Sequence, residues 1–442
     1  MKRGRIDIIT MGCSKNLIDS ERLICRLEEK GYRAYHNSEN PSGEYVVVNT
    51  CGFIGDAKEE SIDMILRLAE HKNEGRIGRL IVMGCLSERY REQLPEEIPE
   101  VDQWFGKFDW KNFIDNLPLS SEIDKKETEN YGEPGPDWER KLTTPPWSAY
   151  IKVSEGCDRY CAYCAIPLIT GRHKSRAIEE ILEETKALVK KGVKEFNVIA
   201  QDLSSYGLDL YGEQKLPELI DRMADIEGVE WIRLHYLYPT DFPYGLLDVM
   251  ARHENICNYL DIALQHISDK VLQGMNRKIT KQETLELLGQ IRAKVPGIHI
   301  RTTLMTGFPG EDENAYEELK EFVATQRFER LGGFAYSEEE DTLAAKTMRD
   351  DIPTETKEER LSEIMAIQQE ISEELNHEKI GMTLKVLVEE IHEGFAIGRT
   401  EYDSPEVDQE VYIDGYKGKT GKFVKVKIQE AGPFELRGIE IE

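Results

Sequence analysis

The sequence predicts an α/β protein in three parts: an N-terminal parallel-sheet βαβ domain, a central partial (β/α) barrel and a small antiparallel β-barrel at the C-terminus. Three observations carry this prediction. Before residue 115, short apolar runs alternate with helix-like segments, and the alternation resumes more regularly after residue 150. Beyond Gly381 the pattern becomes short alternating strands with glycine turns. Strand–helix alternation is typical of parallel sheets, whereas short strands with glycine turns are typical of closed β-structures.

The N-terminal part repeats one unit three times. We expect strands at 6–10, 45–49 and 80–83, each followed by a helix, at 19–30, 56–71 and 88–94. A cysteine stands just after each strand: Cys13, Cys51 and Cys85. Because the carboxyl ends of parallel strands lie at one edge of a sheet, where ligands bind, these three thiols are expected to meet there.

The central part is expected to supply six βα units. Its strands are expected at 149–153, 196–200, 231–235, 259–263, 298–303 and 332–335, with helices such as 178–191 and 281–294. The functional face of such a barrel is the set of loops after the strands. A polar, Gly- and Pro-rich stretch reads as a linker before it. The predicted domains are therefore 1–119, a linker at 120–146, 147–379 and 380–442.

A helix is expected at 355–378, followed by small-barrel strands at 384–388, 396–400, 410–413 and 422–428. Strands this short, divided by glycine turns, close into a barrel because closure leaves no unpaired sheet edge.

Charge limits the partners of this chain. Its 442 residues contain 57 Lys plus Arg and 84 Asp plus Glu, a net charge of −27. Nucleic-acid binding normally needs a basic surface, so an acidic chain favours a basic protein partner, although solubility alone is an equal alternative. No apolar run approaches the roughly 18 residues of a membrane-spanning helix, which predicts a cytoplasmic protein. Eight cysteines in such a protein indicate metal binding or catalysis rather than disulfides.

The strongest motif is Cys157-x3-Cys161-x2-Cys164, just after the first strand of the central part. Thiolates are soft ligands that suit zinc or iron–sulfur clusters. Zinc sites usually show paired C-x-x-C halves or a histidine partner, and neither is near. Three cysteines leave one iron of a four-iron cluster open to a small molecule. Structural cysteines and zinc remain minor alternatives.

At these residues the chain resembles the radical S-adenosylmethionine superfamily. The resemblance implies a partial barrel of radical SAM type in which Cys157, Cys161 and Cys164 hold a [4Fe–4S] cluster. The open iron would bind S-adenosylmethionine, and reduction would generate a 5′-deoxyadenosyl radical. The resemblance also implies cofactor-binding positions at Tyr163 against the adenine, Gln201 near the methionyl group and Gly307 in the turn Gly307-Phe308-Pro309-Gly310-Glu311. Arg176, in the basic loop 171–176, is expected to meet the carboxylate of S-adenosylmethionine or an acidic substrate, and a merely solvated loop is the alternative.

Cys13, Cys51 and Cys85 narrow the resemblance to the methylthiotransferase subgroup. That subgroup carries a second [4Fe–4S] cluster in its N-terminal domain, thought to present the sulfur that is transferred; core packing of the three cysteines is the alternative. No catalytic residue is assigned beyond the cluster ligands. Cys25 and Cys257 match no family ligand and are interpreted as packing.

Within the subgroup, the sequence resembles the branch that modifies a ribosomal protein rather than transfer RNA. The motif Met11-Gly12-Cys13-Ser14-Lys15-Asn16-Leu17 carries this likeness, because the transfer-RNA enzymes tend to have Gln and Met where Ser14 and Lys15 stand. The resemblance implies a methylthio transfer to the β-carbon of an aspartate in small-subunit ribosomal protein twelve. It also implies an external electron donor and a sulfur source.

The C-terminal barrel resembles a TRAM domain, an RNA-binding module in the transfer-RNA enzymes. From Asn376 to Glu442 the chain has 9 Lys plus Arg and 14 Asp plus Glu, a net of −5. An acidic module favours a basic ribosomal protein over phosphate. A secondary RNA contact stays open at the lysines 417, 419, 422, 425 and 427. The alternatives are a transfer-RNA adenosine methylthiotransferase of the same fold and a non-catalytic iron–sulfur factor.

Overall fold

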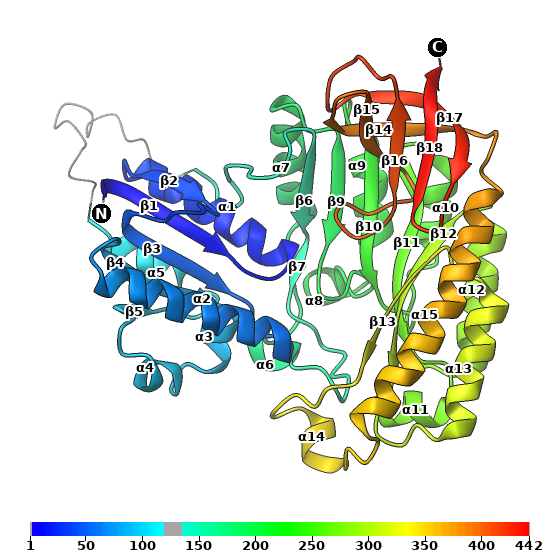
Figure 1. Ribbon diagram of the computed structural model, residues 1–442, viewed down its shortest axis with the longest axis horizontal. Coiled ribbons are helices and arrows are strands. Elements are labelled where there is room, and N and C mark those ends of the chain that lie inside the picture. Colours follow the sequence, from blue (N-terminus) through cyan, green and yellow to red (C-terminus); the bar gives the residue numbers. More distant parts are fainter. Residues whose placement is uncertain (1, 119–134, 442) are drawn as a thin grey trace. The chain divides into compact units, whose positions relative to one another are not determined.

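The computed structural model describes residues 2–118 and 135–441. The chain divides into two compact units (Figure 1). The first contains the described residues before Pro145 together with the short segments Gly156–Asp158 and Ala165–Arg172. The second contains the rest, including the central sheet and the C-terminal barrel.

The first unit is built on a parallel sheet whose described strands run in the order β2-β1-β3-β4-β5. The strands are β1 Lys2–Thr10, β2 Arg33–His36, β3 Gly43–Thr50, β4 Arg79–Gly84 and β5 Gln103–Trp104. The helices are α1 Ser14–Glu29, α2 Gly55–Asn73, α3 Cys85–Arg89, α4 Leu94–Glu97 and α5 Trp110–Asn116. The predicted parallel sheet is confirmed, and the short edge strands β2 and β5 extend it beyond the expected three.

Both faces of this sheet are buried, because consecutive apolar side chains of β3 point to opposite faces. Val46 and Val48 pack with Ile65 and Leu68 of α2 on one face. Val47 points to the other face, into the core that α1 and α5 cover. Each such fully buried aliphatic side chain contributes roughly 1.5–3 kcal/mol of transfer free energy. Burial on both faces therefore stabilises the sheet and holds its strand ends in place.

One predicted helix was wrong. A single helix was expected at 88–94, but the structure has α3, which ends at Arg89, and a separate α4 from Leu94. Tyr90 leaves the helical region at φ −116°, and Pro95 stands in the first turn of α4. Proline suits a helix start because it has no N–H to donate to a preceding turn. Helix α1 also begins earlier than the expected residue 19, at Ser14, with Cys13 as its N-cap.

The linker prediction at 120–146 falls outside the described residues up to 134. The following segment packs onto the first unit. Arg140 forms a buried ion pair with Glu21 of α1, and the N–H of Thr143 donates to the same carboxylate at 2.6 Å. A buried charge needs a partner of opposite sign, so Arg140 fixes this segment in place. The helix α6 (Ile166–Thr170) packs against α3 in the same unit.

The second unit contains a parallel sheet in the order β13-β12-β11-β10-β9-β6, which confirms the predicted partial barrel. Its strands are β6 Ser148–Lys152, β9 Glu195–Ile199, β10 Trp231–Leu237, β11 Ile256–Gln265, β12 His299–Thr306 and β13 Arg330–Ala335. The short strands β7 Ser154–Glu155 and β8 Lys174–Ser175 pair separately as an antiparallel ladder. All neighbouring strands of the main sheet pair in parallel, so their carboxyl ends share one edge.

Helices cover this sheet, as the alternating pattern predicts. They are α7 Ile178–Lys190, α8 Leu208–Tyr211, α9 Leu216–Ala224, α10 Gly245–Arg252, α11 Asp269–Gly274, α12 Lys281–Lys294, α13 Glu313–Gln326, α14 Leu343–Thr347 and α15 Thr354–His377. The long α15 packs along β13, the strand at one edge of the sheet (Figure 1).

The C-terminal barrel is closed in the order β14-β15-β16-β18-β17. Its strands are β14 Thr383–Ile391, β15 Phe395–Thr400, β16 Glu410–Asp414, β17 Phe423–Ala431 and β18 Glu435–Ile441. The prediction missed β18, and β16 pairs with β18 in parallel, so the barrel is not wholly antiparallel. Gly438 interrupts the apolar alternation of β18. A Cβ at Gly438 would lie 2.2 Å from the carbonyl oxygen of Lys427, so the close approach requires glycine.

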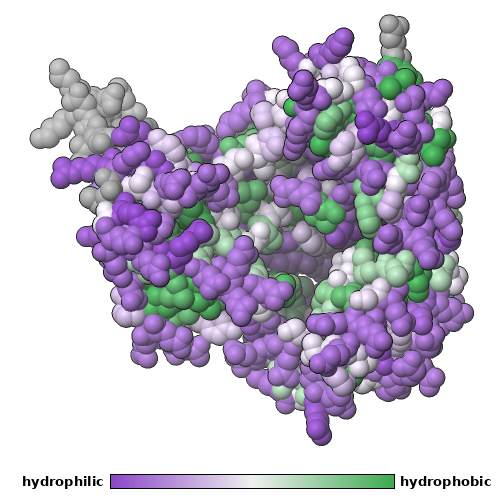
Figure 2. Space-filling model, in the orientation of Figure 1, coloured by the Kyte–Doolittle hydropathy of each residue, from purple (hydrophilic) through white to green (hydrophobic). Residues whose placement is uncertain are grey.

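The face of the molecule seen in Figure 2 is mostly hydrophilic, as expected for a chain rich in charged residues. Within residues 2–118 and 135–441, no helix is both long and apolar enough to cross a membrane.

Candidate iron–sulfur and S-adenosylmethionine sites

Three cysteines lie at the carboxyl edge of the N-terminal sheet, as the strand pattern predicts. Cys13 caps α1 after β1, Cys51 directly follows β3, and Cys85 opens α3 after β4. The strands β1, β3 and β4 are neighbours, with Thr10 paired to Asn49 and Thr50 paired to Gly84. Equal register places the three strand ends, and therefore the three cysteines, at one edge.

Close backbone packing brings these cysteines together. Gly12 has φ +85°, and a Cβ there would lie 2.7 Å from the Cβ of Cys51 and 2.9 Å from its Sγ. Asn16 donates from Nδ2 to the carbonyls of Met11 and Thr50, at 3.1 and 3.0 Å. Its Oδ1 accepts from Cys85 Sγ at 3.5 Å. Asn16 thus ties all three post-strand loops to each other.

The charges around the three thiols also indicate that they are neighbours. The pKa of Cys85 is raised to about 12, chiefly by burial; Lys107 opposes the shift, and the nearby thiols of Cys13 and Cys51 add to it. Burial likewise raises the pKa of Cys51. The pKa of Cys13 is lowered: burial opposes the shift, and Lys15, backbone N–H groups and Lys107 outweigh it. Lys107 is buried and pairs with Asp19 at 3.1 Å.

Three thiols at one sheet edge are soft ligands of the kind that iron–sulfur clusters use. In the described part of the chain, no three Cys, His, Asp or Glu side chains converge closely enough to hold one metal ion. A four-iron cluster places its cysteine ligands on separate irons and so spaces them more widely. Three thiols with a buried lysine nearby suit an anionic cluster, because the lysine offsets part of the charge.

The second cysteine loop follows β7. Backbone hydrogen bonds hold it: the N–H of Cys157 donates to the Gly171 carbonyl at 3.2 Å, and the N–H of Cys164 donates to the Cys161 carbonyl at 3.0 Å. The N–H of Ala162 donates to Met275 at 2.9 Å, and the Ala162 carbonyl accepts from Ala344 at 2.7 Å. These backbone hydrogen bonds hold the three cysteines of the loop in place.

The four residues predicted to contact S-adenosylmethionine are placed as follows. The Tyr163 hydroxyl accepts a hydrogen bond from Arg277 at 3.2 Å. The Tyr163 ring packs edge-on against Phe308, with the ring centroids 6.4 Å apart. Gly307 has φ +73°, and its N–H donates to Glu311 at 3.0 Å. A φ of this sign suits glycine, because a Cβ would be strained there.

Gln201 and Arg176 are already engaged with protein groups. The Gln201 side chain donates to Glu155. Arg176 pairs with Glu180 and Glu184, each at 2.8 Å, and donates to the Lys152 carbonyl at 2.7 Å. A guanidinium shared between two carboxylates has a structural role in the fold. Arg172 of the same basic loop is far more exposed.

Three side chains near Cys161 are Arg159, Tyr238 and Arg277. Sequence reasoning assigned no role to Arg159 or Tyr238, and it placed Arg277 only in a segment that resembles one along the active-site mouth of the subgroup. Tyr238 contacts the Cys161 sulfur, and both arginines lie against the Tyr238 ring. Arg159 stands inside the cysteine motif, but Tyr238 is far from it in sequence and only the fold brings it there. Asp202, next to Gln201, anchors Arg159 at 2.7 Å.

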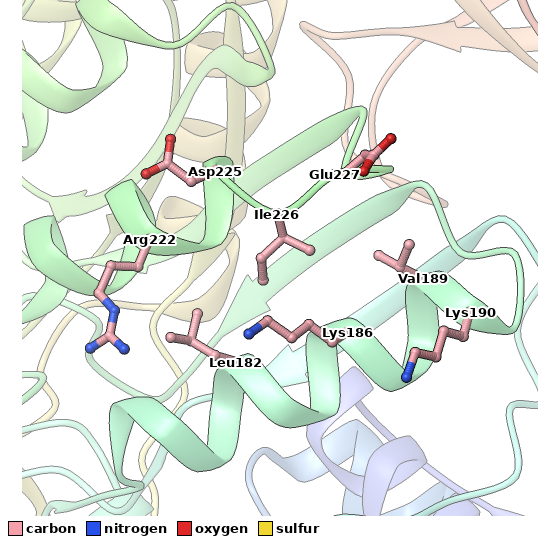
Figure 3. A pocket seen from close by; sticks show the side chains of 8 residues that line it. All are labelled: Leu182, Lys186, Val189, Lys190, Arg222, Asp225, Ile226 and Glu227. Carbon is pink, nitrogen blue, oxygen red and sulfur yellow. The ribbon is translucent and has the colours of Figure 1, made fainter.

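A separate hollow of about 570 Å³ lies between α7 and α9 (Figure 3). It is lined by Leu182, Lys186, Val189, Lys190, Arg222, Asp225, Ile226 and Glu227. Most of these stand at the carboxyl ends of the two helices. Helices run opposite to the strands they follow in a parallel α/β sheet, so this hollow lies toward the strand amino ends, away from the cysteine loop.

Three family models match successive parts of the chain. Residues 5–106 match the uncharacterized protein family UPF0004, residues 151–323 match the radical SAM superfamily, and residues 380–441 match the TRAM domain. The barrel and its cysteine loop therefore define a radical S-adenosylmethionine enzyme, which uses S-adenosylmethionine and an iron–sulfur cluster.

Full-length relatives identify the family. The chain is 57% identical over 438 residues to ribosomal protein uS12 methylthiotransferase RimO of Bacteroides thetaiotaomicron, covering 99% of this chain and 98% of the relative. Proteins of the same name are 56% identical in Porphyromonas gingivalis, over 99% of each chain, and 49% identical in Flavobacterium psychrophilum, over 99% and 98%. The chain belongs to the RimO family of radical S-adenosylmethionine methylthiotransferases.

Solved structures agree on the fold alone. The radical S-adenosylmethionine methyltransferase TsrM from Kitasatospora setae, with cobalamin and a [4Fe-4S] cluster bound, aligns with a TM-score of 0.53 at 14% identity, over 76% of this chain and 72% of that one. The cobalamin-dependent S-adenosylmethionine radical enzyme OxsB aligns with a TM-score of 0.51 at 11% identity, over 84% and 56%.

Proposed function

We propose that this chain adds a methylthio group to the β-carbon of an aspartate in ribosomal protein uS12. The observation that carries the proposal is the match to relatives of that name along 99% of the chain, which includes both sets of three cysteines. The cytoplasm, where ribosomal proteins are found, is the proposed location. An external electron donor and a sulfur source complete the reaction.

Two [4Fe–4S] clusters are proposed, one on each set of three cysteines. Bound there, they would supply the electron that cleaves S-adenosylmethionine to a 5′-deoxyadenosyl radical and a site for the sulfur that is methylated by a second S-adenosylmethionine. Cys157, Cys161 and Cys164 hold the first cluster, and Cys13, Cys51 and Cys85 hold the second.

The protein residues have supporting tasks. Tyr163 borders the adenine site, where its hydroxyl is fixed by Arg277. Gly307 lets the chain turn tightly beside Glu311, which in turn pairs with Arg360 at 2.7 Å. Gln201 lies on the loop after β9. Arg176 holds the basic loop by its two carboxylate partners and is proposed to act on S-adenosylmethionine only through that loop.

The C-terminal barrel is proposed to dock the basic ribosomal protein. A hollow of about 550 Å³ on its surface is lined by Asp408, Glu410, Tyr412, Glu430, Ala431, Gly432, Phe434, Glu435 and Arg437. Its lining has more carboxylates than cations, and Phe434 is exposed. Acidic groups around an apolar side chain complement a lysine- and arginine-rich segment. The lysines on and before β17 are the secondary RNA contact of the alternative.

The testing experiment is a competition. Reconstituted enzyme, S-adenosylmethionine, reductant and sulfide are incubated without oxygen with purified uS12 and bulk transfer RNA in one tube. Mass spectrometry then locates the methylthio group. A gain on an aspartate-containing uS12 peptide supports the proposal. A gain on adenosine instead makes the chain a transfer-RNA methylthiotransferase, and no cleavage of S-adenosylmethionine at all leaves only a structural iron–sulfur factor.

A further inference from the structure

Tyr238 presents its hydroxyl to the sulfur of Cys161. The two atoms lie 3.4 Å apart, a hydrogen-bonding distance for sulfur. Tyr238 follows β10 and is 8% exposed. Its backbone is fixed by Ser204, whose Oγ accepts from the Tyr238 N–H and donates to the Tyr238 carbonyl, both at 2.9 Å. A thiolate sulfur accepts hydrogen bonds, so the Tyr238 hydroxyl is the donor once Cys161 binds metal.

Two guanidinium groups lie against the ring of Tyr238. Arg159 is 4.4 Å from the ring centroid, and Arg277 is 4.3 Å from it. Arg159 is balanced by carboxylates, with Asp202 at 2.7 Å and Asp241 at 2.9 Å. Cation–aromatic contacts of this kind hold a ring in one orientation. The Tyr238 hydroxyl is therefore held in an orientation that points toward the Cys161 sulfur.

Arg277 differs from Arg159 because none of the described carboxylates pairs with it. Its side chain is 4% exposed and donates to the Ala263 carbonyl and to the Tyr163 hydroxyl. Its Nη1 also donates to the Cys161 sulfur, at 3.8 Å. A buried cation is costly without an anion. A metal-bound thiolate at Cys161 is the anion that this position offers.

We propose that Tyr238 and Arg277 are positioning residues that tune the iron–sulfur cluster held by Cys161. The hydroxyl donates to the ligand sulfur, and the guanidinium offsets the negative charge that reduction adds. Hydrogen bonds to cluster sulfurs and nearby charge both set cluster reduction potentials. Together they raise the potential, so the cluster accepts its electron more readily. This inference rests on the proposed cluster at Cys157, Cys161 and Cys164.

The test measures reduction potential, which a merely structural role would not move. The full chain with Cys13, Cys51 and Cys85 changed to alanine isolates one cluster, which is reconstituted without oxygen and titrated by electron paramagnetic resonance. Tyr238→Phe removes the hydroxyl and keeps the ring. In this variant we expect the ratio of reduced to oxidised cluster at a fixed ambient potential to fall several-fold. A tenfold fall in that ratio corresponds to a decrease in reduction potential of about 59 mV for one electron. Tyr244→Phe, an exposed tyrosine beyond the same strand, is the control and should not shift.

Arg277→Gln and Arg277→Lys form the second arm. Arg277→Gln removes the positive charge and should lower the reduction potential of the cluster. Arg277→Lys keeps the charge and should lower the potential less. If Arg277→Gln fails to take up iron, Tyr238→Phe decides alone. A Tyr238→Phe potential equal to that of the parent overturns the inference. Absence of any cluster in the parent triple variant instead overturns the proposed cluster site.

Discussion

Arg399 of the C-terminal barrel donates to Glu195 of the central sheet at 2.7 Å, and both side chains are buried. Glu195 also accepts from Arg233 at 3.2 Å and from Ser148 at 2.7 Å. A second buried pair, Arg330 with Asp403 at 2.5 Å, joins the same two elements of the fold. Because buried charges tolerate little displacement from their partners, these pairs fix the barrel on the sheet.

Glu195→Gln should destabilise the protein by about 3 kcal/mol, because it leaves the buried cations Arg233 and Arg399 poorly compensated. Chemical denaturation gives the free energy of unfolding. Glu230→Gln is the matched control, since Glu230 pairs with Lys385 of the barrel on an exposed surface at 3.2 Å. Exposed pairs contribute about 0–1 kcal/mol. Equal losses in the two variants would refute the fixing role of Glu195.

Acid should weaken the same interaction. Despite burial, which opposes the shift, Arg399 and Arg233 lower the pKa of Glu195 from its ordinary value of 4.5 to about 2. A lowered carboxyl pKa contributes stability that is present above pH 4.5 and is lost as pH falls toward 2. The stability difference between wild type and Glu195→Gln should therefore shrink over that window, by about 3 kcal/mol. A difference that stays constant from pH 6 to pH 3 would contradict this.

Lys379→Met should stabilise the protein at pH 7. Burial, and then the positive charge of Arg330, lower the pKa of Lys379 from 10.5 to about 8. Below pH 8 the charged lysine carries a cost of about 3 kcal/mol, which is relieved as pH rises from 8 to 10.5 because the unfolded chain then binds more protons. The gain from Lys379→Met, read from thermal unfolding, should fall over that window. Lys425→Met, at an exposed position, should gain nothing.

The two sets of cysteines should separate by function. Cys157→Ala should abolish reductive cleavage of S-adenosylmethionine, since the cluster loses a ligand. Cys51→Ala should keep cleavage but abolish methylthio transfer to uS12. Each variant should lose about four irons per chain, while Cys25→Ala should lose none. Product analysis for 5′-deoxyadenosine and for the modified peptide distinguishes these outcomes. Transfer retained in Cys51→Ala would remove the sulfur-carrying role.

Gly12→Ala should disable the N-terminal set without touching any cysteine. The new Cβ would collide with the Cβ of Cys51 at 2.7 Å, and the backbone has φ +85°. We expect loss of about four irons with cleavage of S-adenosylmethionine retained. Gly75→Ala is the matched control, because Gly75 also has a positive φ, of +71°, but faces open space. Iron loss in both variants would point to backbone strain rather than to the Cys51 contact.

Periodicity predicted the parallel sheets and the closed barrel, and motif spacing indicated six cysteines as candidate ligands. Strand–helix alternation is a local pattern, and a parallel sheet collects its strand ends at one edge, so Cys13, Cys51 and Cys85 could be expected together. The short strands β2 and β5 and the glycine-interrupted β18 carried too little alternation to be foreseen. The helix expected at 88–94 failed because Tyr90 leaves the helical conformation and Pro95 starts a new turn.

Only the tertiary structure decided which side chains meet across the sequence. Tyr238 lies 77 positions from Cys161, and Arg277 lies 116 positions from it, so no local pattern connects them. The structure also gave Arg176, predicted to face the cofactor, two carboxylate partners of its own. A local motif fixes ligand type and spacing, because both depend on neighbouring residues. The charges and hydrogen bonds around a ligand depend on long-range packing, which only the fold supplies.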